Sequence, residues 1–181
     1  MKTIRPVLTY ADLSQFPEDG KRYEILEGVL AVSPSPSRKH QLIVWNLVNY
    51  FTRVKTALYG QAYVAPFDVV LDSYNVVQPD IFFIRTDRLA IVTETHVQGA
   101  PDLIVEVLSP TTRGRDLGAK AHLYAQFAVS EYWVIDPDSE TLTVYSLTDT
   151  GYCIEEPLSK PAVVTCSLFP TIPLILADLF I

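Results

Sequence analysis

Hydrophobic residues recur at steps of three and four between His40 and Leu58, and this period predicts a long amphipathic helix. Gly60 follows directly and is expected to end that helix. The stretch 114–128, "GRDLGAKAHLYAQFA", predicts a second helix. The stretch 9–20 predicts a short helix that ends at Pro17 and is followed by a turn at Asp19-Gly20.

Short apolar or alternating runs predict strands between these helices. The runs are 21–33 (two strands joined by a turn near Glu27-Gly28), 62–71, 76–85, 101–108, 131–136 and 141–147. The tail, 169–180, is expected to pack as a loop and a short helix. Helices thus alternate with groups of strands, which predicts an α/β fold with a central mixed sheet flanked by helices. The length suits one domain over residues 1–181.

Composition narrows the class of protein. The chain contains no apolar run long enough to cross a membrane, and its first residues lack an apolar stretch of the signal-peptide type, so we expect a cytoplasmic protein without membrane contact. Cys153 and Cys166 have no CxxC spacing and are expected to be free thiols. The formal net charge of −7 argues against a module that coats nucleic acid by charge alone. It is compatible with an enzyme that binds phosphates through acidic metal ligands and a local basic strip.

One residue violates the apolar pattern of the strand predicted over 101–108. Glu106 stands among Leu103, Ile104, Val105, Val107 and Leu108. A carboxylate in a buried strand is unfavourable unless it is paired with another charge or bound to a cation. Asp80 follows Pro79 at the start of the preceding apolar strand, so the two acids are expected on adjacent strands. A divalent cation would relieve their mutual repulsion.

Lys120 and His40 also interrupt apolar surfaces. Projected at about 100° per residue, the second helix places Lys120 within an apolar arc that includes Leu117 and Tyr124, so Lys120 requires an acceptor such as Glu106. The same projection puts His40 on the apolar stripe of the long helix, at its N-terminal end. Each residue also has an ordinary structural explanation: Lys120 could extend to solvent, and His40 could be a hydrogen-bonded residue at a helix start.

Four segments together carry a family resemblance. They are 22–44 ("RYEILEGVLAVSPSPSRKHQLIV"), 76–84 ("VVQPDIFFI"), 99–137 ("GAPDLIVEVLSPTTRGRDLGAKAHLYAQFAVSEYWVIDP") and 176–180 ("LADLF"). The chain resembles the Uma family of restriction-endonuclease-like proteins, within the PD-(D/E)xK nuclease superfamily. This resemblance covers nearly the whole chain. It implies a restriction-endonuclease-like core and Mg²⁺-dependent hydrolysis of phosphodiester bonds in DNA.

The resemblance assigns roles to individual residues. Asp80 matches the first acid of the superfamily motif and Glu106 the second, whereas Leu108 stands where the motif lysine is expected. In some branches of the superfamily that lysine lies on the following helix, which here implies Lys120. Glu24 matches an additional acid that superfamily members often contribute, although it could also be a surface acid.

The metal ligands implied are Asp80, Glu106 and the backbone carbonyl of Val107, with Mg²⁺ or Mn²⁺ as the ion. Lys120 would position or deprotonate the attacking water, and Glu24 would complete the metal shell. His40 would contact the scissile phosphate or orient a carboxylate.

Two other functions stay open from the sequence. One is a nuclease fold without catalysis that serves as a binding or assembly module, because a fold does not fix a function. The other is a metal-dependent phosphodiesterase that acts on RNA or nucleotides, because the sequence contains no feature that reads DNA base edges. A homodimer is a further expectation, with the apolar tail 172–181 contributing to the interface.

Overall fold

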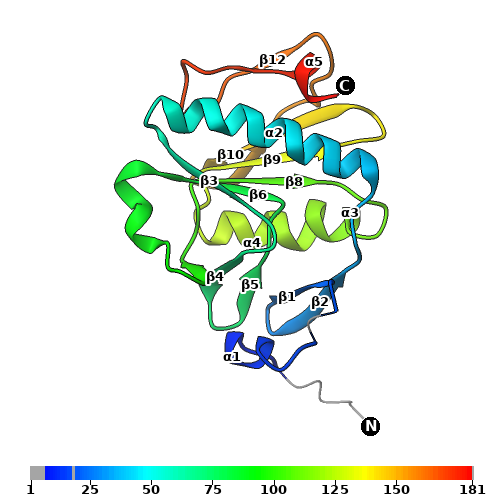
Figure 1. The fold of residues 1–181 in the computed structure, drawn as a ribbon, viewed down its shortest axis with the longest axis vertical. Coiled ribbons are helices and arrows are strands. Elements are labelled where there is room, and N and C mark those ends of the chain that lie inside the picture. The colour runs from blue at the N-terminus through cyan, green and yellow to red at the C-terminus, as the bar shows by residue number, and fades with distance from the viewer. Residues whose placement is uncertain (1–6, 18, 181) are drawn as a thin grey trace.

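The computed structural model describes residues 7–17 and 19–180, and its centre is a mixed sheet of six strands (Figure 1). The strand order is β11-β10-β9-β8-β6-β3. Their bounds are β3 (Gly60–Val64), β6 (Ile81–Arg85), β8 (Leu103–Val107), β9 (Glu131–Asp136), β10 (Thr141–Thr148) and β11 (Gly151–Ile154). Strands β8 and β9 are parallel, and the other neighbours are antiparallel. Strand β11 was not predicted from the sequence.

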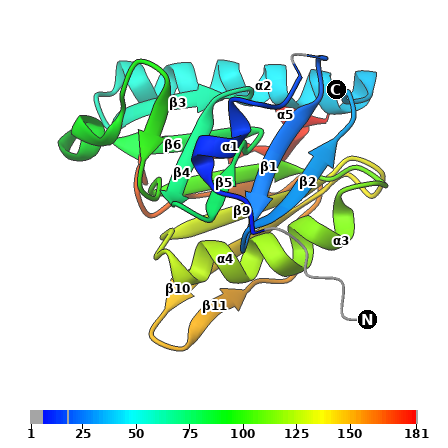
Figure 2. The same ribbon diagram turned by 90° about the horizontal axis from the view of Figure 1, so that it is seen from below.

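Helices cover both faces of this sheet (Figures 1 and 2). Helix α2 (Arg38–Thr56) packs on one face through Ile43, Leu47 and Phe51. The other face carries a helical segment made of α3 (Arg113–Arg115), the π-helical turn η2 (Asp116–Lys120) and α4 (Ala121–Gln126). The predicted fold class, a central mixed sheet flanked by helices, is therefore confirmed.

A second sheet of five strands lies beside the first, and the sequence did not reveal it. Its order is β2-β1-β5-β4-β7. The bounds are β1 (Arg22–Leu26), β2 (Val29–Ser33), β4 (Asp68–Asp72), β5 (Asn75–Val77) and β7 (His96–Gln98). The predicted strands 62–71 and 76–85 each divide at a proline, Pro66 or Pro79, and their two halves join different sheets. Proline lacks an amide proton for the sheet ladder, so these are the natural points of division.

Short elements complete the described chain. They are α1 (Tyr10–Leu13), the 3₁₀ helix η1 (Thr86–Ile91), β12 (Val163–Val164), β13 (Leu174–Ile175) and α5 (Leu176–Leu179). Residues 1–6, which begin the N-terminal stretch without a signal-type apolar run, lie outside the described residues, as does Glu18. None of the helices in the described ranges is long and apolar enough to span a membrane.

The tail packs on its own chain. Leu174, Leu176, Leu179 and Phe180 are buried in the core that contains α2. These side chains are therefore covered within the molecule, whereas Ile175 of the same tail is exposed. The expected homodimer stays a prediction. Ile181 lies outside the described residues.

Two local predictions were wrong for identifiable reasons. Helix α2 ends at Thr56 rather than at Gly60, and Leu58 adopts the left-handed conformation with φ 64°. Gly60 instead starts β3, where an added Cβ would lie 2.2 Å from the Ile84 carbonyl oxygen. Leu117 is exposed rather than in the apolar arc, because the π-helical turn rotates the residues before Lys120 away from the regular 3.6-residue period.

Candidate active site

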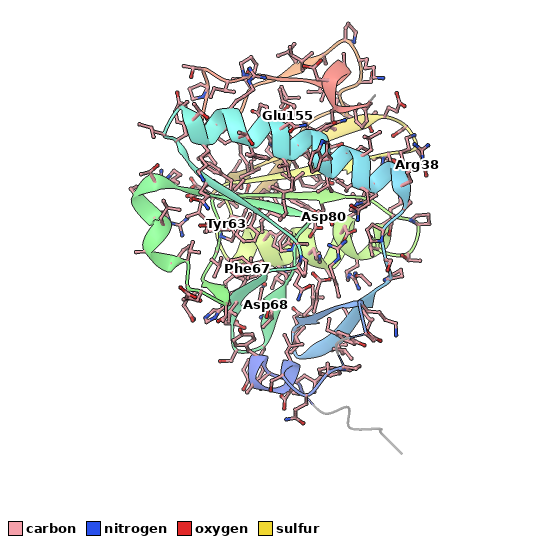
Figure 3. The ribbon with its side chains drawn as sticks, viewed as in Figure 1. Arg38, Tyr63, Phe67, Asp68, Asp80 and Glu155 are labelled. Atoms are coloured by element: carbon pink, nitrogen blue, oxygen red, sulfur yellow. The ribbon has the colours of Figure 1, made fainter. Side chains whose placement is uncertain are left out.

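A cleft of about 410 Å³ opens between the two sheets, at the end of the central sheet where β8 ends and β6 begins. Strand β1, the loop 34–37 and the first residues of α2 form one part of its wall. The loop 108–112 and the start of the following helical segment form another. Strands β6 and β8 are antiparallel neighbours, with Ile81 opposite Val105, so Asp80 and Glu106 reach the same end of the sheet. Figure 3 labels Asp80 beneath helix α2.

Asp80 is buried, and each of its carboxylate oxygens accepts hydrogen bonds. Arg22 Nη1 lies 2.7 Å from Oδ1. His40 Nε2 lies 3.0 Å from Oδ2, and the backbone N–H of Val107 donates to Oδ2 at 2.9 Å. Burial alone would raise the pKa of Asp80, but His40, Arg22 and the Val107 N–H outweigh it and lower the pKa to about 2. Asp80 is therefore an anion at neutral pH.

Glu106 is equally buried but is in a more acidic environment. Its Oε1 accepts hydrogen bonds from Lys120 Nζ at 2.8 Å and from the Tyr124 hydroxyl at 2.9 Å. Within the described chain its Oε2 accepts one long bond, from the Asp80 N–H at 3.4 Å. Burial raises the pKa of Glu106 to about 8, and Asp116 and Asp80 add to the rise while Lys120 opposes it.

Lys120 lies at the centre of an acidic group. Its ammonium nitrogen is 2.8 Å from Glu106 Oε1, 2.7 Å from Glu24 Oε1 and 3.8 Å from Asp116 Oδ1. Burial alone would lower the pKa of Lys120, but the three carboxylates outweigh it and raise the pKa above its ordinary value. Lys120 is the last residue of the π-helical turn, a feature that often marks functional sites.

Glu24 reaches this group from the second sheet. Arg22 and Glu24 are two positions apart on β1, so both side chains face the cleft, whereas Ile25 faces its own apolar cluster. Glu24 Oε1 accepts the Gln78 N–H at 2.9 Å, and Oε2 lies 3.4 Å from Arg115 Nη2. Arg115 also donates to the Ser33 hydroxyl.

The structure brings together every residue that the sequence selected for the site. Asp80, Glu106, Lys120, Glu24 and His40 are each at most 5% exposed. These five residues and Val107 all line the same cleft. Lys120 does not extend to solvent, and Glu24 is not a surface acid.

Three neighbours were not selected from the sequence for these contacts: Arg22, Asp116 and Tyr124. Asp116 precedes Lys120 by four residues, a spacing that signals a helical ion pair. Arg22 precedes Glu24 by two, which signals a shared face of a strand.

The donor set can be tested for a divalent cation. Among residues 7–17 and 19–180, no group of three or more His, Cys, Asp or Glu side chains is arranged as a metal site. Asp80 and Glu106 nevertheless supply hard oxygen donors, which Mg²⁺ and Mn²⁺ prefer. Lys120 occupies Glu106 Oε1, but among the described residues Oε2 accepts only one long hydrogen bond, so this oxygen has room to bind a cation. The residues therefore fit a divalent cation, on condition that Arg22 leaves Asp80 Oδ1.

Comparison with known proteins identifies a family and a similar fold. The family model Uma2, described as "Putative restriction endonuclease", matches residues 10–176. Among solved structures, the chain is similar to the crystal structure of a putative nuclease belonging to DUF820 from Anabaena variabilis, with 24% sequence identity and a TM-score of 0.80. That alignment covers 96% of this chain and 97% of the other, and it establishes a shared fold. No curated protein matches.

Proposed function

This chain belongs to the Uma2 family of putative restriction endonucleases, and from that premise we propose that it is a metal-dependent endonuclease that hydrolyses phosphodiester bonds in DNA. The family and the nuclease-type fold support a nuclease. The observation that carries the proposal further is the pair of buried carboxylates, Asp80 and Glu106, at one end of neighbouring strands, with Lys120 donating to Glu106. This arrangement has no evident structural purpose that an apolar core would not serve better.

In this proposal Asp80, Glu106 and the backbone carbonyl of Val107 hold a Mg²⁺ or Mn²⁺ ion. When bound, such a cation lowers the pKa of a water molecule and stabilises the charge on a phosphate. His40 and the Val107 N–H fix Asp80 Oδ2, so the orientation of this carboxylate is set before any cation arrives. Tyr124 and Lys120 likewise fix Glu106 Oε1.

Lys120 acts in this proposal as a fixed positive charge. Its raised pKa keeps the ammonium protonated at neutral pH, so it is suited to orient the attacking water and to stabilise negative charge in the transition state. The same raised pKa makes it a poor general base. Glu24 holds Lys120 from the side of the second sheet, at 2.7 Å, and is proposed to position it.

The test is cleavage of supercoiled plasmid in the presence of Mg²⁺ or Mn²⁺. Asp80→Asn, Glu106→Gln and Lys120→Met each keep a similar side-chain volume and remove an ionisable group. We expect each to lose at least about 100-fold in rate, since single electrostatic groups in active sites commonly contribute that much. Lys55→Met, on the exposed end of α2, is the matched control and should cut at the wild-type rate.

The outcomes separate this proposal from its alternatives. Cutting of RNA or nucleotides but not of DNA would keep the metal site and change the substrate. Folded wild-type protein that cuts nothing and binds no Mn²⁺ by calorimetry would favour a binding module without catalysis. Cutting that survives in Lys120→Met but not in the acid variants would remove the role assigned to Lys120.

A further inference from the structure

Arg22 occupies the side of Asp80 that faces the cleft. Its Nη1 is 2.7 Å from Asp80 Oδ1 and 3.4 Å from the Gln78 carbonyl oxygen. Arg22 belongs to β1 of the second sheet, whereas Asp80 immediately precedes β6 of the central sheet. The two oxygens of Asp80 are thus held differently: Oδ2 by His40 and a backbone N–H, and Oδ1 by a guanidinium from another sheet.

The cations in the cleft differ in how firmly they are held. Lys120 contacts three carboxylates, and its side chain is 3% exposed. Arg22 pairs with one carboxylate, and its side chain is 20% exposed. Arg22 can therefore move into the adjacent cleft while its backbone stays in β1, whereas Lys120 is enclosed. Of the contacts on Asp80, the one with Arg22 is the most readily exchanged.

A divalent cation bound to Asp80 and Glu106 would come into conflict with Arg22. Both positive groups use Asp80 Oδ1, because Oδ2 already accepts two hydrogen bonds. Like charges at contact distance in a partly buried cleft repel strongly. The arginine and the cation therefore exclude one another on this oxygen.

We propose that Arg22 substitutes for the metal on Asp80 in the resting protein and competes with the divalent cation, so that the cation binds only when Arg22 swings away. This inference rests on the proposed function. Arg22 then acts as a built-in restraint on metal loading. Its freed guanidinium, in a cleft that accepts a phosphodiester, has the geometry to bind a phosphate in bidentate fashion. A bound phosphate group thereby favours metal loading through the same side chain.

The experiment is calorimetric titration of the full chain with Mn²⁺, without substrate. We expect Arg22→Gln to bind Mn²⁺ at least about tenfold more tightly than the wild type, because the competing charge on Oδ1 is removed while His40 and the Val107 N–H still hold Oδ2. Arg22→Lys keeps a positive charge and should bind within about threefold of the wild type. Arg53→Gln changes the net charge equally at an exposed position of α2 and should have no effect. Circular dichroism confirms that each variant is folded.

Two results decide the origin of the effect. In Arg22→Gln/Asp80→Asn the gain in affinity should vanish, since it depends on Asp80. Equal or weaker Mn²⁺ binding by folded Arg22→Gln overturns the inference and makes Arg22 a residue that holds Asp80 in place. If Arg22→Gln binds no more tightly but the wild type cuts DNA with Mn²⁺, the proposed nuclease function holds and only the role of Arg22 is rejected. If neither protein binds Mn²⁺ and the wild type cuts nothing, both proposals fail.

Discussion

Glu24 and Glu106 lie on different sheets and share one ammonium group, that of Lys120, at 2.7 and 2.8 Å. The contact joins the second sheet to the central sheet and to the helical segment behind it. Each participant is nearly fully buried. The proposed active site therefore also connects the layers of the fold. Substitutions in it are expected to change stability as well as activity.

Removal of the Lys120 charge should destabilise the fold. Lys120→Met leaves Glu24 and Glu106 buried without their cation, and breaking a buried ion pair from one side typically reduces the free energy of unfolding by about 3–5 kcal/mol. We expect a loss in that range at neutral pH, measured by urea unfolding. Lys55→Met, exposed at the end of α2, should stay within about 0.5 kcal/mol of the wild type.

The double variant Lys120→Met/Glu24→Gln tests the origin of that loss. Glu24 lies 2.7 Å from the lysine nitrogen, so replacing it removes a buried acid that Lys120→Met leaves without its cation, and the double variant should recover at least about 1 kcal/mol relative to Lys120→Met. A double variant that is less stable than Lys120→Met would show that the loss arises from packing rather than charge.

The raised pKa of Glu106 predicts that the fold becomes less stable as the pH rises. Its pKa is raised to about 8 from an ordinary 4.5, so the folded state holds this proton more tightly than the unfolded state. The stabilisation is complete below pH 4.5 and is lost as the pH rises through about 8. We expect the free energy of unfolding to fall by at least about 1 kcal/mol between about pH 5 and pH 8.

Glu106→Gln cannot lose a proton and should show a clearly flatter pH dependence in urea unfolding over the same interval. Glu155→Gln is the matched control, because Glu155 is an exposed acid far along the chain (labelled in Figure 3), and it should keep the wild-type slope. Equal slopes for wild type and Glu106→Gln would mean that Glu106 is ionised throughout, with Lys120 as its full counter-charge.

The sequence predicted those site residues that violate an apolar pattern. Glu106 interrupts a strand and Lys120 interrupts a helical stripe, and such violations are visible in the local sequence. Arg22 gives no such signal, because an arginine in an alternating strand is ordinary on a solvent-facing side. Its role depends on a second sheet that contains the parallel β4–β7 pair and brings β1 against the central sheet. Such long-range pairing leaves no local pattern.

Asp116 was not predicted although its spacing offered a signal. A regular helix turns about 100° per residue, so a residue four positions before Lys120 falls on the same face, and an acid at that spacing is typical of a helical ion pair. Leu117 was placed wrongly for a different reason: on the regular projection it belongs to the buried arc, whereas the π-helical turn over Asp116–Lys120 changes the rotation and leaves it exposed. A π turn has no reliable sequence signature, so the exposure of Leu117 could not be predicted.

His40 should contribute stability through Asp80. The bond between His40 Nε2 and Asp80 Oδ2 is buried, and hydrogen bonds to charged groups contribute about 1.5–3 kcal/mol. His40→Ala should be destabilised by that amount at about pH 6, measured by urea unfolding, whereas His122→Ala, an exposed histidine on α4, should change by less than about 0.5 kcal/mol.

The pH dependence of the stability lost in His40→Ala tests whether His40 acts through Asp80. The pKa of Asp80 is lowered to about 2, so its stabilisation is present above pH 3.8 and is lost as the pH falls through about 2. The difference between His40→Ala and the wild type should therefore shrink as the pH is lowered from about 4 toward 2. A deficit that stays constant across that interval would assign the effect of His40 to packing alone.

Replacement by alanine is expected to have opposite effects on stability at Gly60 and Gly118. At Gly60 an added Cβ would lie 2.2 Å from the Ile84 carbonyl oxygen and 2.6 Å from the Phe83 ring, with backbone on one side and a buried aromatic on the other. Neither can yield easily, so Gly60→Ala should lower the free energy of unfolding by about 1–3 kcal/mol. At Gly118, in the π-helical turn, a Cβ meets nothing within 4 Å, and Gly118→Ala should stabilise by up to about 1 kcal/mol. Urea unfolding of the two variants measures both values. Equal effects at the two sites would contradict the close approach of β3 to β6 at Gly60.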